Sequence, residues 1–156
     1  MRLALAEARL AFDAGEVPVG AVAVYRDQVV GRGHNRKETQ RDPTAHAEVL
    51  ALREAARTRG GWRLANVDLY CTMEPCPMCA GAIVHARVKR VVFAARDPRT
   101  GAAGSVFDLL PSDQRFNHYT EVDHGIMSEE ASGMLSSFFR KRRQQKLQQK
   151  KSESQK

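Results

Sequence analysis

The chain has 156 residues, 42% of them hydrophobic and 28% charged, which is the composition of a globular protein with one domain. No apolar run approaches the roughly 18 residues of a membrane span, and Glu7 and Arg9 interrupt the first residues, so we expect neither a membrane protein nor a signal peptide. Of the three cysteines, two form a Cys-x-x-Cys pair, which favours metal ligands in a reducing cytoplasm over a disulfide framework.

The first residues of the chain predict a helix followed by a pair of strands. Residues 2–14 are rich in Ala, Leu and Glu, and Gly15 after them is typical of a helix C-terminus. Val19–Tyr25 and Val29–Gly33 have the composition of strands, and the three polar residues between them predict a hairpin. A polar loop over 36–41 is expected next.

A second helix is expected after this loop. Asp42 can cap its N-terminus, and Pro43 suits a position in its first turn. Gly60 and Gly61 end it. Helical spacing predicts that its buried face is formed by Ala45, Val49, Leu52 and Ala56.

The second half of the chain alternates strands with helices. We expect strands over 67–72, 90–95 and 121–123, a small-residue helix over 76–86, a short helix near Phe107–Leu110, and a final helix that Ser128 caps. This last helix has an apolar stripe of Ala131, Met134, Leu135, Phe138 and Phe139. The alternation predicts an α/β sandwich, and the opening hairpin makes its sheet mixed rather than all-parallel.

The net charge of +7 is concentrated at the C-terminus. Residues 140–156 contain eight basic side chains and one acidic side chain, so the rest of the chain is neutral. A neutral body with a basic extension indicates an anionic partner, most often nucleic acid. A solubilising, frayed tail is the alternative. We therefore expect a domain over residues 1–143 that includes its C-terminal helix, and a basic, frayed or disordered tail over 144–156.

Two short segments offer the ligands of a catalytic metal site. His46-Ala47-Glu48 supplies an imidazole and a carboxylate, and 75–79 supplies the thiolates of Cys76 and Cys79. Three protein ligands with room for water are typical of catalytic zinc, whereas a structural zinc site closes with four. Both segments begin expected helices, whose N-terminal ends favour thiolates. His46 and Glu48 are two residues apart, so both reach one ion only if it lies over the open helix end.

Zinc fits this mixed set of ligands best, and Glu48 is left free to act as a general base. Two other residues compete for the metal. Cys71 could complete a structural site with four ligands, but its position inside an expected strand favours a buried core thiol. His34, at the end of another expected strand, is an alternative ligand.

His-x-Glu followed by Pro-Cys-x-x-Cys is the known signature of zinc nucleobase deaminases. Over nearly its whole length the chain resembles the bacterial tRNA-specific adenosine deaminases, within the cytidine deaminase-like superfamily. The segments closest to that family are Val17–Val22, His34–Arg36, Asp42–Thr44, Arg96-Asp97 with Thr100–Ser105, and Phe138–Arg143. The resemblance implies a three-layer α/β/α sandwich with a five-stranded mixed sheet, one zinc ion per subunit and a homodimer.

The resemblance also implies an activity, the hydrolytic deamination of adenosine to inosine at the wobble position of a tRNA anticodon stem-loop, with release of ammonia. In that family pattern His46, Cys76 and Cys79 hold the zinc. Glu48 activates the water, protonates N1 of the adenine and assists the departure of ammonia.

The same family pattern implies contacts to the target nucleoside. Asn35 is expected to hydrogen-bond it, and Val19 to wall the base pocket. Asp97 follows the expected central strand, and we hypothesise that its carboxylate accepts a hydrogen bond from a ribose 2′-hydroxyl and so favours RNA over DNA. Capping of the loop over 96–105 is the alternative role of Asp97.

The final helix supplies the remaining expected RNA contacts. Arg140, Arg142 and Arg143 are expected to bind backbone phosphates. Phe138 and Phe139 could offer a stacking face near the anticodon loop, although their place in the apolar stripe predicts core packing for at least one of them.

Two other functions fit the metal motifs. A deaminase of a free base or nucleotide (guanine, cytidine or deoxycytidylate) shares them, but it has no use for a basic extension. A zinc-stabilised RNA-binding module without enzymatic activity is the other candidate, but a purely structural site has no use for Glu48.

Overall fold

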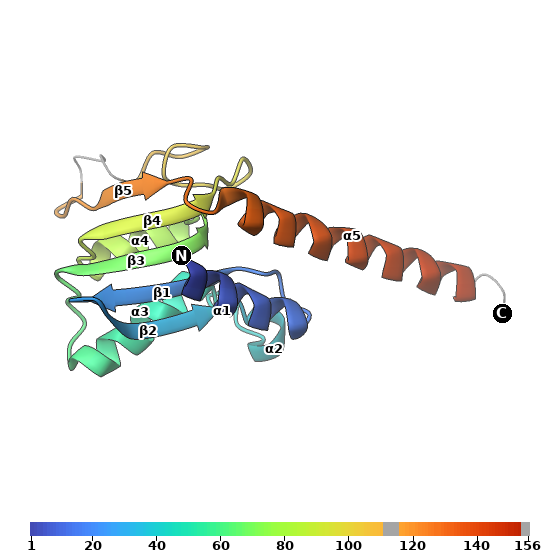
Figure 1. Cartoon of the computed structure of the whole chain (residues 1–156), viewed down its shortest axis with the longest axis horizontal. Helices are drawn as coiled ribbons and strands as arrows, with labels where there is room; N and C mark the ends of the chain where they lie inside the picture. The colour runs from blue at the N-terminus through green and yellow to red at the C-terminus, as the bar shows by residue number, and fades with distance from the viewer. Residues whose placement is uncertain (111–115, 154–156) are drawn as a thin grey trace.

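A computed structural model describes residues 1–110 and 116–153 of the chain, and it contains a mixed five-stranded sheet (Figure 1). The strands lie in the order β2-β1-β3-β4-β5. Their bounds are β1 Gly20–Tyr25, β2 Gln28–His34, β3 Val67–Met73, β4 Arg90–Ala95 and β5 Glu121–His124. β1 pairs antiparallel with β2 and β3, whereas β3, β4 and β5 are parallel. The mixed sheet expected from the opening hairpin is confirmed.

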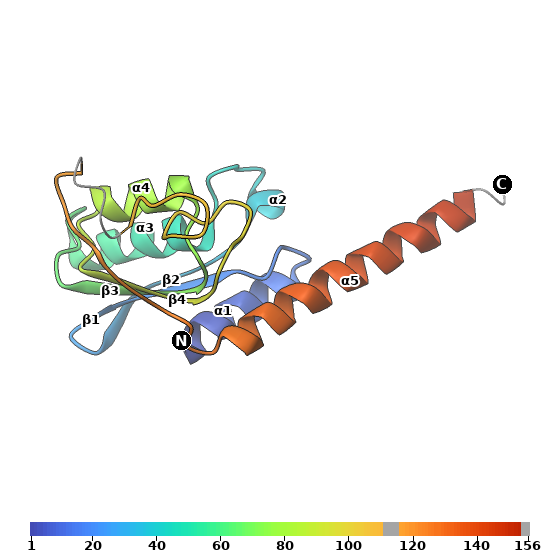
Figure 2. The ribbon, with the colours of Figure 1, turned by 90° about the horizontal axis from the view of Figure 1, so that it is seen from above.

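Helices cover both faces of this sheet and complete three layers. Helices α1 (Arg2–Asp13) and α5 (Ser128–Glu153) lie on one face, and α3 (Ala47–Arg59) and α4 (Pro77–His85) lie on the other (Figure 2). A short helix, α2 (Lys37–Gln40), follows β2 within the segment that we expected to be a polar loop. The three-layer sandwich predicted from the sequence is confirmed.

Small residues let the helices lie close to the sheet. A Cβ added to Gly33 on β2 would approach the carbonyl oxygen of Ala47 in α3 to 2.2 Å, and one added to Gly20 would approach the carbonyl oxygen of Ala4 in α1 to 2.1 Å. No side chain fits at either position.

The β1–β2 turn consists of Arg26 and Asp27, both with positive φ, as a two-residue hairpin with the native twist requires.

Helix α3 begins four residues later than the sequence predicted. Asp42 does not cap it, because Oδ1 of Asp42 accepts hydrogen bonds from the backbone N–H of Thr44 (2.8 Å) and from the Thr44 hydroxyl (2.7 Å). Such a local turn competes with helix formation. The N-cap residue is His46 instead. The buried face shifts accordingly, and its hydrophobic members are Ala47, Ala51, Leu52 and Ala55.

The short helix predicted near Phe107–Leu110 is wrong. Ala103 and Asp108 form an isolated antiparallel bridge there. The carbonyl oxygen of Gly101 accepts the N–H groups of both Val106 and Phe107, which closes a compact loop in place of a helical turn.

Helix α5 is longer than the sequence suggested. It runs unbroken to Glu153, although we expected fraying beyond residue 143, and Figure 1 shows it extending well past the sheet. Among its described residues only Ala131 and Phe138 are buried, so its packing against the body ends near the predicted domain boundary. The division of the chain at residue 143 itself stays a prediction. Within the described residues, no helix combines the length and the apolar character needed to cross a membrane.

Candidate active site

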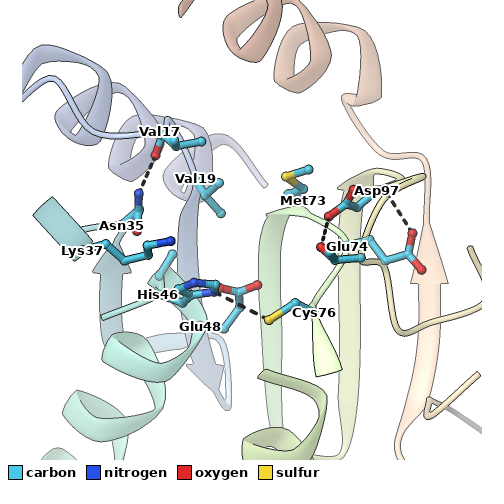
Figure 3. Close-up of a pocket in the computed structure, with 12 residues that line it drawn as sticks. Val17, Val19, Asn35, Lys37, His46, Glu48, Met73, Glu74, Cys76 and Asp97 are labelled. Carbon is cyan, nitrogen blue, oxygen red and sulfur yellow. Dashed lines mark hydrogen bonds between the residues drawn. The ribbon is translucent and has the colours of Figure 1, made fainter. Parts of the chain in front are cut away.

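Two helix N-termini converge on one point between α3 and α4 (Figure 3). His46 is the N-cap of α3, and Cys76 is the N-cap of α4, where Pro77 occupies the first position. Cys79 lies one turn further into α4. Both N-cap residues have extended backbone angles, which turn their side chains over the helix ends. The geometric prediction of a site over the open end of a helix agrees with this arrangement.

The three side chains are spaced as zinc ligands. Nδ1 of His46 lies 3.7 Å from Sγ of Cys76 and 3.6 Å from Sγ of Cys79. Tetrahedral bonds of about 2.3 Å to sulfur and about 2.0 Å to nitrogen put two such ligand atoms about 3.5 Å apart. All three candidate ligand atoms lie within 4.8 Å of one another, and among the described residues these three form the one cluster of this kind. The donor set therefore fits zinc.

The two competing ligands lie elsewhere. Cys71 is fully buried in the hydrophobic core, and burial raises the pKa of its thiol well above the usual value. Nδ1 of His34 lies 2.9 Å from a carboxylate oxygen of Glu7, and its Nε2 accepts a hydrogen bond from Arg36. Both ring nitrogens of His34 are thus engaged away from the cluster.

The environment of the cluster favours the deprotonated form of one ligand, the Cys76 thiol, and the protonated forms of the other two. Hydrogen bonding with Cys79 lowers the pKa of the Cys76 thiol to about 4, although burial opposes the shift. The same hydrogen bond, together with burial, raises the pKa of Cys79. Hydrogen bonding to Cys76 raises the pKa of His46. One thiolate is therefore present before a metal binds, and a bound cation favours the second.

One oxygen of the Glu48 carboxylate has no hydrogen-bond partner in the described part of the protein. Its side chain is 3% exposed, and among the described residues Oε2 of Glu48 is the one buried side-chain oxygen or nitrogen without a hydrogen-bond partner. Burial raises its pKa above the ordinary value for a glutamate. A buried acceptor without a partner costs free energy unless a ligand or water completes it. Glu48 therefore lies ready for a group that enters the pocket.

A pocket of about 170 Å³ opens over this cluster, and it is lined by Val17, Val19, Asn35, Lys37, His46, Ala47, Glu48, Met73, Glu74, Cys76, Asp97 and Thr100. The structure thus brings Val19, Asn35 and Asp97 together with the metal cluster, as the sequence predicted (Figure 3). Asn35 is held by its amide nitrogen, which donates to a carboxylate oxygen of Glu16 and to the carbonyl oxygen of Val17, each at 3.3 Å.

Sequence reasoning missed Glu74, which organises one wall of the pocket. Its carboxylate accepts the N–H groups of Asp97 (3.0 Å), Ala103 (2.9 Å) and Ser105 (3.1 Å) and also the Ser105 hydroxyl. Although burial acts in the opposite direction, these hydrogen bonds hold the pKa of Glu74 below its usual value. A Cβ on Gly101 would approach the Glu74 carboxylate carbon to 2.4 Å, so the loop closes on the carboxylate only with glycine there.

Asp97 caps its own loop. One carboxylate oxygen accepts the N–H of Arg99 at 2.9 Å, and the other accepts the hydroxyl of Thr100 at 2.6 Å. The alternative role considered for Asp97 is therefore present, and the residue also lines the pocket. A contact to a ribose hydroxyl stays a prediction.

The predicted residues of the final helix lie outside this pocket. Phe138 is 5% exposed and packs against Phe12 of α1, with ring centroids 5.7 Å apart. Its ring is part of the packing between the two helices, which is the core role expected for at least one of Phe138 and Phe139, and a stacking contact with RNA stays a prediction. Phe139 is 43% exposed and is the freer of the two rings. Arg140, Arg142 and Arg143 are exposed on α5.

Comparisons with known proteins agree with the geometry. Residues 1–95 match the family model described as the cytidine and deoxycytidylate deaminase zinc-binding region. A tRNA-specific adenosine deaminase of Bacillus subtilis is 49% identical over 94% of this chain and 90% of its own length, and that of Haemophilus influenzae is 51% identical over 94% and 84%. A solved structure from a study of A-to-I editing by tRNA:A34 deaminases at the wobble position has a TM-score of 0.83 and 42% identity, covering 86% of this chain and 97% of the other.

Proposed function

The chain belongs to the tRNA-specific adenosine deaminases, within the family that shares the cytidine and deoxycytidylate deaminase zinc-binding region, and we propose that it converts adenosine to inosine at the wobble position of a tRNA. The reaction consumes one water and releases ammonia. The relatives named for this activity align over most of the chain, and the pocket holds the groups that the chemistry needs. A tRNA substrate supports a cytoplasmic location, which belongs to the same proposal.

The metal in this proposal is zinc, held by His46, Cys76 and Cys79. When bound, it supplies Lewis-acid activation of the attacking water, whose pKa falls from 15.7 toward about 7. Both helix N-termini point at this position, and their partial positive ends favour the anionic ligands.

Glu48 moves the protons. Its free Oε2 takes one proton from the water and delivers that proton to N1 of the adenine. The water oxygen forms a bond to C6. Glu48 then transfers the second water proton to the exocyclic nitrogen as the bond from C6 to that nitrogen breaks. N1 keeps a hydrogen, C6 keeps the oxygen, and ammonia leaves, so the atoms balance. The raised pKa of Glu48 suits a group that both accepts and returns a proton near neutral pH.

Residues around the cluster position the nucleoside. Val19 and Met73 offer apolar walls for the base, and Asn35, fixed through its amide nitrogen by Glu16, offers its amide oxygen to the nucleoside. Asp97 and Thr100 lie on the wall that Glu74 holds, where a ribose would pass. These contacts belong to the proposal.

The basic side chains of α5 extend the binding surface to the tRNA backbone. Arg140, Arg142 and Arg143 are exposed and carry charge that a small substrate would not need. Arginine suits phosphate because its guanidinium donates two parallel hydrogen bonds.

The proposed enzyme is a homodimer. An apolar hollow between α3 and α4 is lined by Val49, Leu52, Ala56, Leu64 and Ala82 beside Trp62, which is 59% exposed. A large aromatic residue beside an apolar patch is typical of an interface between chains. Sedimentation of the Trp62→Glu variant tests this, since a monomer is expected in place of a dimer, and an unchanged dimer contradicts this choice of interface.

The observation that carries the function is the unpartnered Glu48 oxygen beside three metal ligands in one pocket. The decisive experiment incubates the zinc-loaded chain with a tRNA that has adenosine at the wobble position and, separately, with free adenosine, guanine and cytidine. Inosine in the tRNA alone is expected. Deamination of the free compounds alone would show a deaminase of small molecules, and zinc binding without any deamination would show a binding module.

A further inference from the structure

A second cavity lies beside the exposed edge of β2, and four arginines line it. It has a volume of about 630 Å³ and is bounded by α1, β2, α2 and α3. We call it the arginine cleft, after Arg32, Arg36, Arg53 and Arg57. Figure 1 shows these helices grouped around the end of the sheet that β2 forms.

The two carboxylates of the cleft are already engaged. Glu7 contacts Nδ1 of His34 at 2.9 Å and a guanidinium nitrogen of Arg32 at 3.7 Å. Glu54 accepts the backbone N–H of Arg32 at 2.9 Å and so satisfies a donor on the edge strand. Both acids therefore serve β2 and its side chains.

The other three guanidinium groups lack such partners. Within residues 1–110 and 116–153, no carboxylate lies within 4.0 Å of the guanidinium nitrogens of Arg36, Arg53 or Arg57. Arg36 donates to Nε2 of His34 at 3.1 Å, which leaves its charge uncompensated. Arg53 and Arg57 are four residues apart on α3, where like charges repel each other. The cleft thus has an excess of positive charge that a bound anion would relieve.

The arginine cleft and the catalytic pocket share one wall. His34 lines the cleft, and the next residue, Asn35, lines the pocket. Arg36 again lines the cleft, and Lys37 lines the pocket, where Figure 3 shows its amine. A polynucleotide with one base in the pocket can therefore continue over this wall into the cleft.

We propose that the arginine cleft binds a backbone phosphate of the substrate RNA close to the target adenosine. This inference rests on the proposed function, because it takes the strand entering the pocket to be RNA. Guanidinium groups bind phosphate oxygens through paired, charge-assisted hydrogen bonds, and three of them around one cavity match a phosphodiester. The contact is independent of base identity, so it adds affinity and orientation rather than sequence recognition.

The test is the salt dependence of RNA binding. An anticodon stem-loop RNA is titrated with the full, zinc-loaded chain at several salt concentrations, for the wild type and for Arg53→Gln/Arg57→Gln. Each phosphate contact contributes roughly 0.7 to the slope of log affinity against log salt for a single strand. Because both arginines are proposed to hold the same phosphate, the slope is expected to fall by about 0.7 and binding to weaken by about tenfold at physiological salt. Arg53 also lines the apolar hollow beside Trp62, whereas Arg57 does not, so Arg57→Gln alone is measured as well and is expected to lower the slope in the same direction.

A matched control removes the same charge from the opposite end of the sheet. Arg26 follows β1 and Lys89 precedes β4, both exposed at the end of the sheet where Val67 begins β3, and Lys89→Gln/Arg26→Gln should leave the slope unchanged. An unchanged slope in the cleft variant would overturn the proposal. An equal fall of the slope in both double variants would also overturn it, because the loss would then come from the net positive charge of the protein and not from the cleft. A change in oligomeric state for Arg57→Gln would also overturn it and would identify the cleft as an interface between chains.

Binding is measured here without turnover. If the wild-type chain formed no inosine in the tRNA, the proposed function would fail, while the slopes would still decide whether the arginine cleft holds a phosphate.

Discussion

The catalytic pocket and the C-terminal helix differ in the physical properties that set the size of a mutational effect. In the pocket Glu48 is 3% exposed, its Oε2 has no protein partner among the described residues, and it adjoins two helix N-termini. On α5, which at about 1.5 Å per residue is about 39 Å long, only Ala131 and Phe138 are buried, and the basic side chains lie in solvent.

This contrast indicates how the two regions contribute to function. Electrostatic interactions are strong where water is excluded, so single groups in the pocket have large effects that depend little on salt. Exposed charges on α5 act through screened, roughly additive contacts with phosphate. We therefore expect the pocket to determine the turnover rate and the helix to determine affinity, and four predictions test that division.

The largest effect is expected for Glu48→Gln. The amide keeps the volume of the side chain but cannot take a proton from water, so kcat should fall by about 10³- to 10⁴-fold. Zinc content and tRNA affinity should stay at the wild-type level, because the three ligands and α5 are untouched. Single-turnover deamination and metal analysis measure these quantities. The exposed Glu38→Gln is the control, and residual activity within tenfold of the wild type would contradict a role for Glu48 in proton transfer.

The next effect concerns α5. Arg140→Gln/Arg142→Gln/Arg143→Gln removes three phosphate contacts, so we expect binding to weaken by roughly 50-fold at physiological salt and the salt slope to fall by about 2. The rate at saturating tRNA should change little if the division between pocket and helix is correct. Titrations at several salt concentrations, with single-turnover rates, measure both.

The control for α5 removes three charges further along the same helix, with Lys146→Gln/Lys150→Gln/Lys151→Gln. A smaller loss of affinity is expected there, because these residues lie farther from the body (Figure 1). Equal losses in the two triple variants would show that total charge matters rather than position, and an unchanged slope in the arginine variant would refute its phosphate role.

The metal site was predictable from sequence because its chemistry is local. His46 and Glu48 are two residues apart, and Cys76 and Cys79 are three apart, so each pair needs only its own helix end to be positioned. The strands were predictable for a similar reason, since β4 is an unbroken apolar segment whose bounds the structure reproduces.

The features that sequence did not predict depend on partners distant along the chain. Glu74 binds donors 23 to 31 residues away, and nothing near it in the sequence marks that role. The helical stripe predicts core packing for Phe138 or Phe139 without saying which, and only the contact with Phe12 shows that it is Phe138. The start of α3 was misplaced because a good capping residue, Asp42, bonds to Thr44 instead of to a helix.

A third prediction concerns Glu74, which belongs to the pocket but does not reach its metal ligands. In Glu74→Gln the amide group cannot accept all four hydrogen bonds, so buried donors of the loop lose their partner, at a cost of about 1–3 kcal/mol in unfolding free energy. The loosened wall carries Asp97 and Thr100, so kcat/KM for tRNA should fall by about tenfold, mostly through KM.

Thermal unfolding and steady-state kinetics measure the effect of Glu74→Gln. Ser105→Ala is the matched control, since it removes only the hydroxyl donor and should give a smaller change in the same direction. A loss confined to kcat, or a loss of zinc, would show that Glu74 supports the metal site. It would contradict a role in holding the wall of the pocket that contacts the substrate.

The smallest effect is expected for Asp97→Asn. This variant tests whether the pocket contacts the ribose of the target nucleoside through Asp97. Both carboxylate oxygens already accept hydrogen bonds within the loop, but each oxygen has a second lone pair that can accept a ribose 2′-hydroxyl. Loss of one such bond, at about 1 kcal/mol, should lower the preference for an RNA stem-loop over the matched DNA stem-loop by about fivefold. Thr100→Ala disturbs the loop and leaves the carboxylate in place, so it separates the two roles. Two outcomes would show that Asp97 acts only as a loop cap: an equal loss of preference in Thr100→Ala and Asp97→Asn, or an unchanged preference in Asp97→Asn. In either case the discrimination between RNA and DNA would arise outside the pocket.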